Sequence, residues 1–223
     1  MFVGHLAVAI ASKKLEPTVP LGHALAAAFG LDLLWPLLLL LGVETVRVSP
    51  EDTAFTALHF ESYPWSHSLL MAVLWSVLFA LFARRSLTPR VSILLGMLVA
   101  SHWFLDVVTH RPDLPLWPGG PQLGAGLWNS VPATLLVEGT LLVTAVALYL
   151  RMTTPRDRAG TLIFLGLVAL CGAIWLAQPW SPPPPSAAAV AWVGLALWLI
   201  PPWGAWAERH RAVVAIPSPG AQR

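Results

Sequence analysis

Six long apolar stretches divide the 223-residue sequence and restrict the folds open to it. The core of a bilayer offers no hydrogen-bond partner to the backbone, so an apolar stretch of about 20 residues satisfies its N–H and C=O groups as a helix. We place the spans near residues 20–42, 67–84, 91–109, 131–151, 160–178 and 187–206. Only 11% of the residues are charged and 57% are hydrophobic. The sequence therefore predicts an all-α integral membrane protein with about six transmembrane helices.

A shorter apolar segment precedes these spans at residues 2–14 and is too short to cross a bilayer. Lys13 and Lys14 follow its apolar run, whereas a secretory signal peptide carries its positive charges ahead of that run. We interpret it as a half-membrane helix with its lysines at the membrane surface. Residues 1–206 then form one helical membrane domain, with a metal-site half in 1–145, scaffold helices in 160–206 and a cytoplasmic tail in 207–223.

Basic residues are distributed unequally between the two sides of this arrangement. With the N-terminus inside, 11 of the 13 Lys and Arg residues lie on the inner side, and only Arg47 and Arg111 lie outside. The positive-inside rule thus predicts that both termini are cytoplasmic. The basic residues are spread along the loops instead of forming a patch, so we expect no nucleic-acid partner.

Acidic residues inside the predicted spans are the strongest indication of function. Asp32, Asp106 and Glu138 lie at depths where an isolated carboxylate is costly, and neither Lys nor Arg is predicted beside them. A divalent cation would neutralise them, and nearby histidines are suitable ligands for zinc, manganese or iron. A relay of protonated acids and neutral histidines is the alternative interpretation.

The spacing within one span places candidate ligands on a single helix face. His102 and Asp106 are four residues apart, so they are rotated by only about 40° around the helix and can reach one ion. His110 lies one turn further and would serve a second ion or a substrate. Depth in the membrane adds three more candidates. We therefore predict one or two divalent ions, zinc first, bound by His5, Asp32, His67, His102, Asp106 and His110.

The order of these residues resembles a known family. An early His5, an intramembrane Asp32, the Ser-His-Ser of residues 66–68 and the HxxxD of His102 and Asp106 are similar to the prokaryotic membrane-bound metal-dependent hydrolases, also described as LexA-regulated inner-membrane hydrolases. The likeness covers roughly residues 1–145. It implies location in a prokaryotic inner membrane.

The ligand order is also distantly similar to the zinc-dependent phospholipase C and P1 nuclease group, which cleaves phosphoesters. Where that group has a closing HxxxE, this chain has Thr134 in place of the histidine and retains Glu138. These resemblances imply hydrolysis of a phosphoester in a lipid or lipid-linked substrate at the outer face. Asp106 would bridge ions and act in catalysis, and Glu138 would be the general base or acid.

Two other classes of function remain open. A divalent-metal or proton translocating protein would also place His and Asp inside the membrane, but we would expect polar residues in the cytoplasmic half and broken helices in paired positions. A non-catalytic membrane assembly factor would tolerate replacement of the polar cluster without losing an ion.

Overall fold

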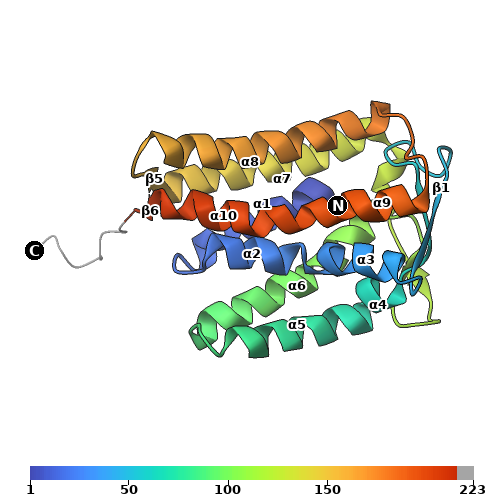
Figure 1. Ribbon diagram of the computed structural model, residues 1–223, viewed down its shortest axis with the longest axis horizontal. Coiled ribbons are helices and arrows are strands. Elements are labelled where there is room, and N and C mark those ends of the chain that lie inside the picture. The colour runs from blue at the N-terminus through green and yellow to red at the C-terminus, as the bar shows by residue number, and fades with distance from the viewer. Residues whose placement is uncertain (215–223) are drawn as a thin grey trace, which may run out of the picture.

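Helices that run along one common axis make up most of the computed structural model, which describes residues 1–214 (Figure 1). The longest are α6 (Pro89–Thr109), α7 (Val131–Met152) and α8 (Arg158–Ala177). The others are α1 (Phe2–Leu15), α2 (Leu21–Ala28), α3 (Gly30–Leu40), α4 (Pro64–His67), α5 (Leu69–Ala83), α9 (Ala187–Gly194) and α10 (Ile200–Arg209), with the 3-10 turns η1 (Leu127–Asn129), η2 (Gln178–Trp180) and η3 (Leu195–Leu199).

Four helical segments are long and apolar enough to cross a membrane: Pro89–Thr109, Val131–Met152, Arg158–Trp180 and Ala187–Arg209. The pair α2 and α3 makes a fifth if it counts as one span, although it is bent by 53°. The prediction of a helical membrane protein is confirmed, but the prediction of six spans is wrong for the described residues. Helix α5 has 15 residues, which reach about 22 Å and fall short of a hydrocarbon core of about 30 Å.

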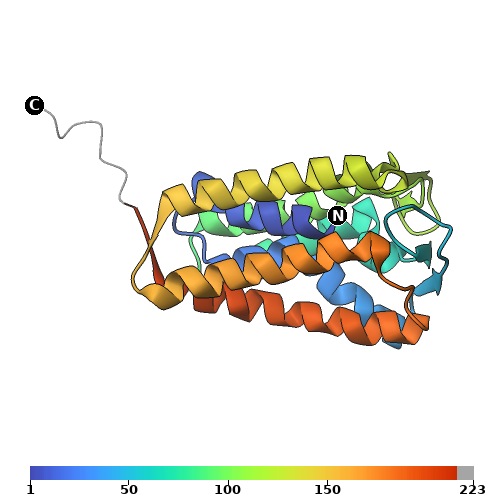
Figure 2. The ribbon, with the colours of Figure 1, turned by 90° about the horizontal axis from the view of Figure 1, so that it is seen from above.

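Helix α1 occupies the centre of the bundle, which explains why its residues 2–11 are apolar on all sides apart from His5. Val3, Leu6 and Ile10 are fully buried, as is Leu25 of the neighbouring α2. A helix that is hydrophobic on all sides is stable when other helices enclose it. Figures 1 and 2 show the start of α1 inside the bundle, so this half-length helix carries its first residues to mid-depth.

Three short antiparallel sheets of two strands each lie at the ends of the helices and were not predicted. Strand β1 (Thr45–Val48) pairs with β2 (Leu58–Ser62), and β3 (Leu114–Pro115) pairs with β4 (Gln122–Leu123). Strand β5 (Thr153–Pro155) pairs with β6 (Arg211–Val213). Residues 207–209 belong to α10, so the helical bundle continues beyond the predicted boundary at residue 206; residues 215–223 of the predicted tail lie outside the described residues.

The two ends of the bundle differ in charge. The β5–β6 sheet joins the segment after α7 to the end of α10, and contacts of Lys13 with Glu208 and Arg90 with Glu16 bring α1 and α6 to the same end. Ten basic residues lie in or beside these segments: Lys13, Lys14, Arg84, Arg85, Arg90, Arg151, Arg156, Arg158, Arg209 and Arg211. The opposite end, with β1 to β4, has Arg47 and Arg111.

Candidate metal centre

Five of the six predicted ligands converge from four helices. Two overlapping groups of ligand atoms, each lying within 4.8 Å of one another, consist of His5 with His102 and Asp106, and of Asp32 with His67 and His102. Helices α1, α3, α4 and α6 contribute them. The side chains are at most 5% exposed, except that of Asp32 at 23%. The cluster therefore combines three imidazoles and two carboxylates in a largely buried position.

The carboxylate of Asp106 lies at the centre of this cluster. Its Oδ1 is 3.1 Å from Nε2 of His5, and its Oδ2 is 3.1 Å from Nε2 of His102 and 3.8 Å from Nε2 of His67. Oδ1 also accepts a hydrogen bond of 2.5 Å from the Met1 amine. Asp32 faces the same atoms, with Oδ1 3.5 Å from Nε2 of His67 and 3.7 Å from Nε2 of His102.

These distances suit a tetrahedral ion. Ligand atoms at 2.0–2.1 Å from a tetrahedral zinc are separated by about 3.4 Å. The four measured separations that join Asp32 and Asp106 to His67 and His102 run from 3.1 to 3.8 Å. Four of the six pairwise separations among these atoms thus suit ligands of one ion, and Asp32, His67 and His102 form the group in which all ligand atoms lie within 4.8 Å of one another.

The break between α2 and α3 orients His102. Phe29 leaves the helical conformation at φ −90° and ψ 3°, and the carbonyl of Ala28 accepts a hydrogen bond of 2.7 Å from Nδ1 of His102. This bond places the proton on Nδ1 and leaves the lone pair of Nε2 facing the two carboxylates. Nε2 has no hydrogen-bond partner among the described residues. A lone pair that faces carboxylate oxygens requires a cation or a proton between them.

A hydrogen-bonded chain from Glu44 orients His67. The Ser66 hydroxyl donates to Oε2 of Glu44 at 2.6 Å, so its oxygen can only accept from Nδ1 of His67, also at 2.6 Å. Oε1 of Glu44 accepts from the backbone N–H groups of Trp65 and Ser66, at 2.8 Å each. Nε2 of His67 therefore keeps its lone pair toward Asp32. Glu44 is 1% exposed, and its contact with the residues of the cluster was not predicted from the sequence.

His110 lies outside both groups of ligand atoms. Helix α6 ends at Thr109, and His110 adopts an extended conformation with φ −64° and ψ 147°. Extending the helical spacing to this residue therefore misplaced its side chain. Nδ1 of His110 lies 3.0 Å from Oδ1 of Asp113 and 3.2 Å from the Tyr63 hydroxyl. Its ring lines the cavity beside the cluster.

Asp113 belongs to a polar network at the same end of the molecule. It accepts hydrogen bonds from the Tyr63 hydroxyl at 2.7 Å and from Nε of Arg111 at 3.2 Å. Burial alone would raise the pKa of Asp113, but hydrogen bonds with His110, Tyr63 and Arg111 hold that pKa below its usual value. Burial and the neighbouring Asp113 raise the pKa of Tyr63 well above its usual value. This network fixes the loop that follows α6.

Glu138, the predicted base or acid, is fully buried on α7. Its Oε1 accepts a hydrogen bond of 3.4 Å from the Trp128 indole, and its Oε2 has no hydrogen-bond partner among the described residues. Glu138 belongs to neither group of ligand atoms and does not line the adjoining cavity. Its predicted role in proton transfer stays a prediction.

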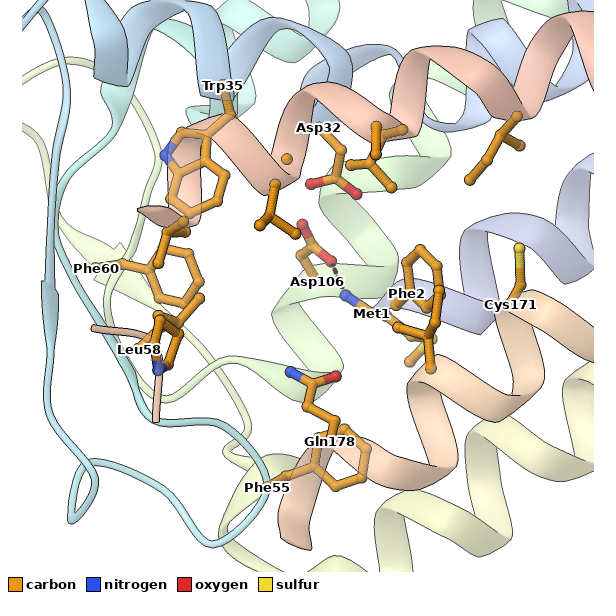
Figure 3. A pocket seen from close by; sticks show the side chains of 18 of the residues that line it. Met1, Phe2, Asp32, Trp35, Phe55, Leu58, Phe60, Asp106, Cys171 and Gln178 are labelled. Atoms are coloured by element: carbon orange, nitrogen blue, oxygen red, sulfur yellow. Dashed lines mark hydrogen bonds and ion pairs between the residues drawn. The ribbon is translucent and has the colours of Figure 1, made fainter. Parts of the chain in front are cut away.

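A cavity of about 640 Å³ adjoins the cluster, and Figure 3 shows Asp32 and Asp106 facing into it. The remaining wall is mostly apolar and includes Trp35, Phe55 and Phe60. Residues of the predicted scaffold helices also line it, among them Leu167, Cys171 and Val193. The buried His and Asp groups could hold a metal ion with open access from this cavity.

Comparisons with known proteins leave the family open. No family model, curated protein or solved structure matches this chain. The resemblance to the membrane-bound metal-dependent hydrolases therefore stays a prediction from the motifs.

Proposed function

We propose that this protein is a membrane-embedded hydrolase that cleaves a phosphoester with water activated by a divalent metal ion, zinc before manganese or iron. The observation that supports the proposal is the convergence of three imidazoles and two carboxylates beside a cavity. Within residues 1–214, the Met1 amine pairs with Asp106, and no Lys or Arg side chain forms an ion pair with Asp32 or Asp106. Two buried carboxylates that share one amine fit a site for a further cation.

The orientation of His102 limits how the ligands can be distributed between two ions. Because Nδ1 bonds to Ala28, His102 offers only Nε2 and belongs to one ion. His67, His102 and Asp32 would hold that ion, and Oδ2 of Asp106, 3.1 Å from Nε2 of His102, would be a further oxygen donor. His5 and Asp106 would take part in holding a second ion, for which Oδ1 of Asp106 would have to exchange its hydrogen bond with the Met1 amine. Asp106 would then be shared by both ions.

The reaction in this proposal is attack of water on phosphorus. A divalent ion held by these residues would supply a bound water whose pKa is lowered toward about 7. The water oxygen would form a bond to phosphorus as it gives its proton to a base, and the ester P–O bond would break as the leaving alkoxide takes up a proton. Glu138, with its unpartnered Oε2, is proposed as the proton carrier. We place the protein in a prokaryotic inner membrane, with membrane lipids as partners and without nucleic acid.

Metal content tests this proposal first. Detergent-purified wild type should retain one or two ions per chain after dialysis without chelator, measured by inductively coupled plasma mass spectrometry. His102→Ala and Asp106→Ala should lose them because each removes a central ligand. His23→Ala is the matched control, since His23 is exposed on α2. Wild type without metal, even after reconstitution with zinc or manganese, would contradict the proposal and favour a proton relay.

Hydrolysis is the second part of the test. Phosphoester and lipid substrates should be cleaved by the metal-loaded wild type, and Glu138→Gln should keep its metal but lose most of the rate. General acid–base groups typically contribute about 10²–10⁴-fold. A Glu138→Gln variant with full activity would remove Glu138 from the mechanism and leave the metal site standing.

Metal translocation is the second candidate, and the bend of 53° between α2 and α3 favours it. A broken helix beside an acidic residue is a common feature of ion-binding transporters. Leu6 and Ile10 of α1 and Leu95 of α6 are nevertheless fully buried, so apolar side chains pack the bundle on the side of the cluster that leads to the basic end. Uptake of zinc or manganese into proteoliposomes would establish this alternative, and its absence together with hydrolysis would exclude it.

A further inference from the structure

The cavity beside the candidate metal centre has one polar region and a long apolar remainder. Asp32, Asp106 and His67 form the polar part, and residues of α8, α9 and η3 form much of the apolar part. A volume of about 640 Å³ lies within the range of small-molecule binding sites. A ligand that fills it must therefore combine a polar group with a sizeable apolar group.

The apolar part opens sideways between two helices. Ile174 of α8 and Val193 of α9 both line the cavity, yet they are 54% and 73% exposed. Figure 2 shows that α8 and the α9–α10 segment lie together near the β5–β6 sheet and separate toward the opposite end. Both helices belong to segments long and apolar enough to cross a membrane. The side opening therefore faces the lipid.

Aromatic residues cover the end of the cavity that lies nearest the loops. Phe55 is 2% exposed, and its backbone N–H donates to the carbonyl of Trp128 at 3.0 Å. Phe60 of β2 packs against Trp35 of α3 with ring centroids 5.4 Å apart. These rings stand between the loops and the carboxylates in Figure 3. A ligand dissolved in water has a less direct path to the carboxylates than one dissolved in the membrane.

We propose that the cavity takes a single-chain phosphoester amphiphile from the membrane, with its phosphate at the metal centre and its alkyl chain between α8 and the α9–η3 segment. The inference rests on the proposed function, because a phosphate beside Asp32 and Asp106 requires a metal ion to offset the like charges. The metal centre accounts for the phosphate alone. The apolar wall and its side opening supply the site for the alkyl chain.

Photocrosslinking tests the path of the chain. The probe is hexadecylphosphonate with a diazirine in the middle of its chain, because its C–P bond resists hydrolysis. With metal-loaded wild type, mass spectrometry should find crosslinks in residues 167–178 and 189–200. Excess hexadecylphosphonate should compete for these crosslinks, and ethylphosphonate should not. Crosslinks spread equally over the exposed faces of α5 and α7, or not reduced by the competitor, would overturn the proposal.

A matched pair of variants locates the site on α9. Ala189 lines the cavity, whereas the adjacent Ala188 is exposed and does not line it. Ala189→Trp should abolish the competed crosslinks because its side chain fills the apolar part, and Ala188→Trp should retain them. Equal crosslinking in both variants, with normal metal content, would place the chain elsewhere.

A neutral probe separates this inference from the proposed function. Hexadecanol with the same diazirine needs no metal ion to occupy the apolar part. If the protein binds no metal but the neutral probe crosslinks α8 and α9, the proposed function fails and the chain site stands. If metal is bound and neither probe crosslinks these helices, the chain site fails and the metal-dependent hydrolase stands.

Discussion

At the residue scale, the ligands alone do not define the candidate metal centre, because the lone pairs of two histidines depend on residues behind them. Ala28 fixes His102 through a backbone carbonyl freed by the helix break. Glu44 fixes His67 through the Ser66 hydroxyl. Such partners set which ring nitrogen is protonated, and their loss typically reduces metal affinity by about 10–100-fold. Glu44 is therefore a positioning residue in this proposal.

Replacement of Glu44 should weaken metal binding without removing a ligand. In Glu44→Gln the amide can donate to Ser66, so the hydroxyl is free to donate to Nδ1 of His67 and favour the wrong tautomer. We expect zinc affinity to fall by about 10–100-fold, measured by competition with a chelating dye. Glu61→Gln is the control, since Glu61 is exposed and pairs with Arg47. Unchanged affinity in Glu44→Gln would restrict Glu44 to a structural role at α4.

The sequence predicts ligands well where local geometry determines their positions. His102 and Asp106 share a helix face because they are four residues apart, and the burial of His5 follows from an apolar half-length helix. His110 required knowledge of where α6 ends, and apolar composition does not mark that point. Glu44 is 22 residues from Ser66, so only the fold of the β1–β2 hairpin brings them together.

At the element scale, composition predicts apolar segments better than their interruptions. The stretch 20–42 reads as one span because both sides of the break at Phe29 are apolar. In the stretch 67–84, Ser68 ends α4 and caps α5 by accepting from the Met71 N–H, which shortens the following helix to 15 residues. The short sheets depend on pairing between separate segments, which are distant in the chain in the case of β5 and β6.

The N-cap of α8 gives a prediction about pH. Oδ1 of Asp157 accepts from the Gly160 N–H at 2.8 Å, and Oδ2 lies 2.8 Å from Nδ1 of His210. The hydrogen bonds with His210 and Gly160 lower the pKa of Asp157 in the folded state. The stabilisation is therefore present above the unfolded-state pKa, near 3.9, and is lost as the pH falls through the lower folded-state pKa.

Asp157→Asn isolates the charge because asparagine retains a capping oxygen. At pH 7 the variant should unfold at a lower temperature than wild type in the same detergent, monitored by circular dichroism. The difference should shrink as the pH falls below about 4. Glu51→Gln, an exposed loop substitution, should show no comparable difference. A gap between wild type and Asp157→Asn that stays constant down to pH 3 would show that the charge contributes nothing.

At the scale of the whole molecule, the cluster lies between two ends that differ in their number of basic residues. The end with the β5–β6 sheet holds ten basic residues, and the end with β1 to β4 holds two among residues 1–214. The aromatic cover of the cavity belongs to the second end. Because cytoplasmic segments carry the excess of Lys and Arg, we expect the end with the β5–β6 sheet to face the cytoplasm and the metal centre to lie nearer the outer face.

Single cysteines at the two ends test this orientation. Ser86 follows α5 at the basic end and Ser181 follows η2 at the opposite end, and both are exposed. In a Cys171→Ala background, which removes the only native thiol, a membrane-impermeant maleimide should label Ser181→Cys in intact cells. It should label Ser86→Cys only after permeabilisation. The reverse pattern would show that the protein has the opposite orientation in the membrane. The cavity would then open toward the cytoplasmic leaflet, and the substrate would have to come from that side.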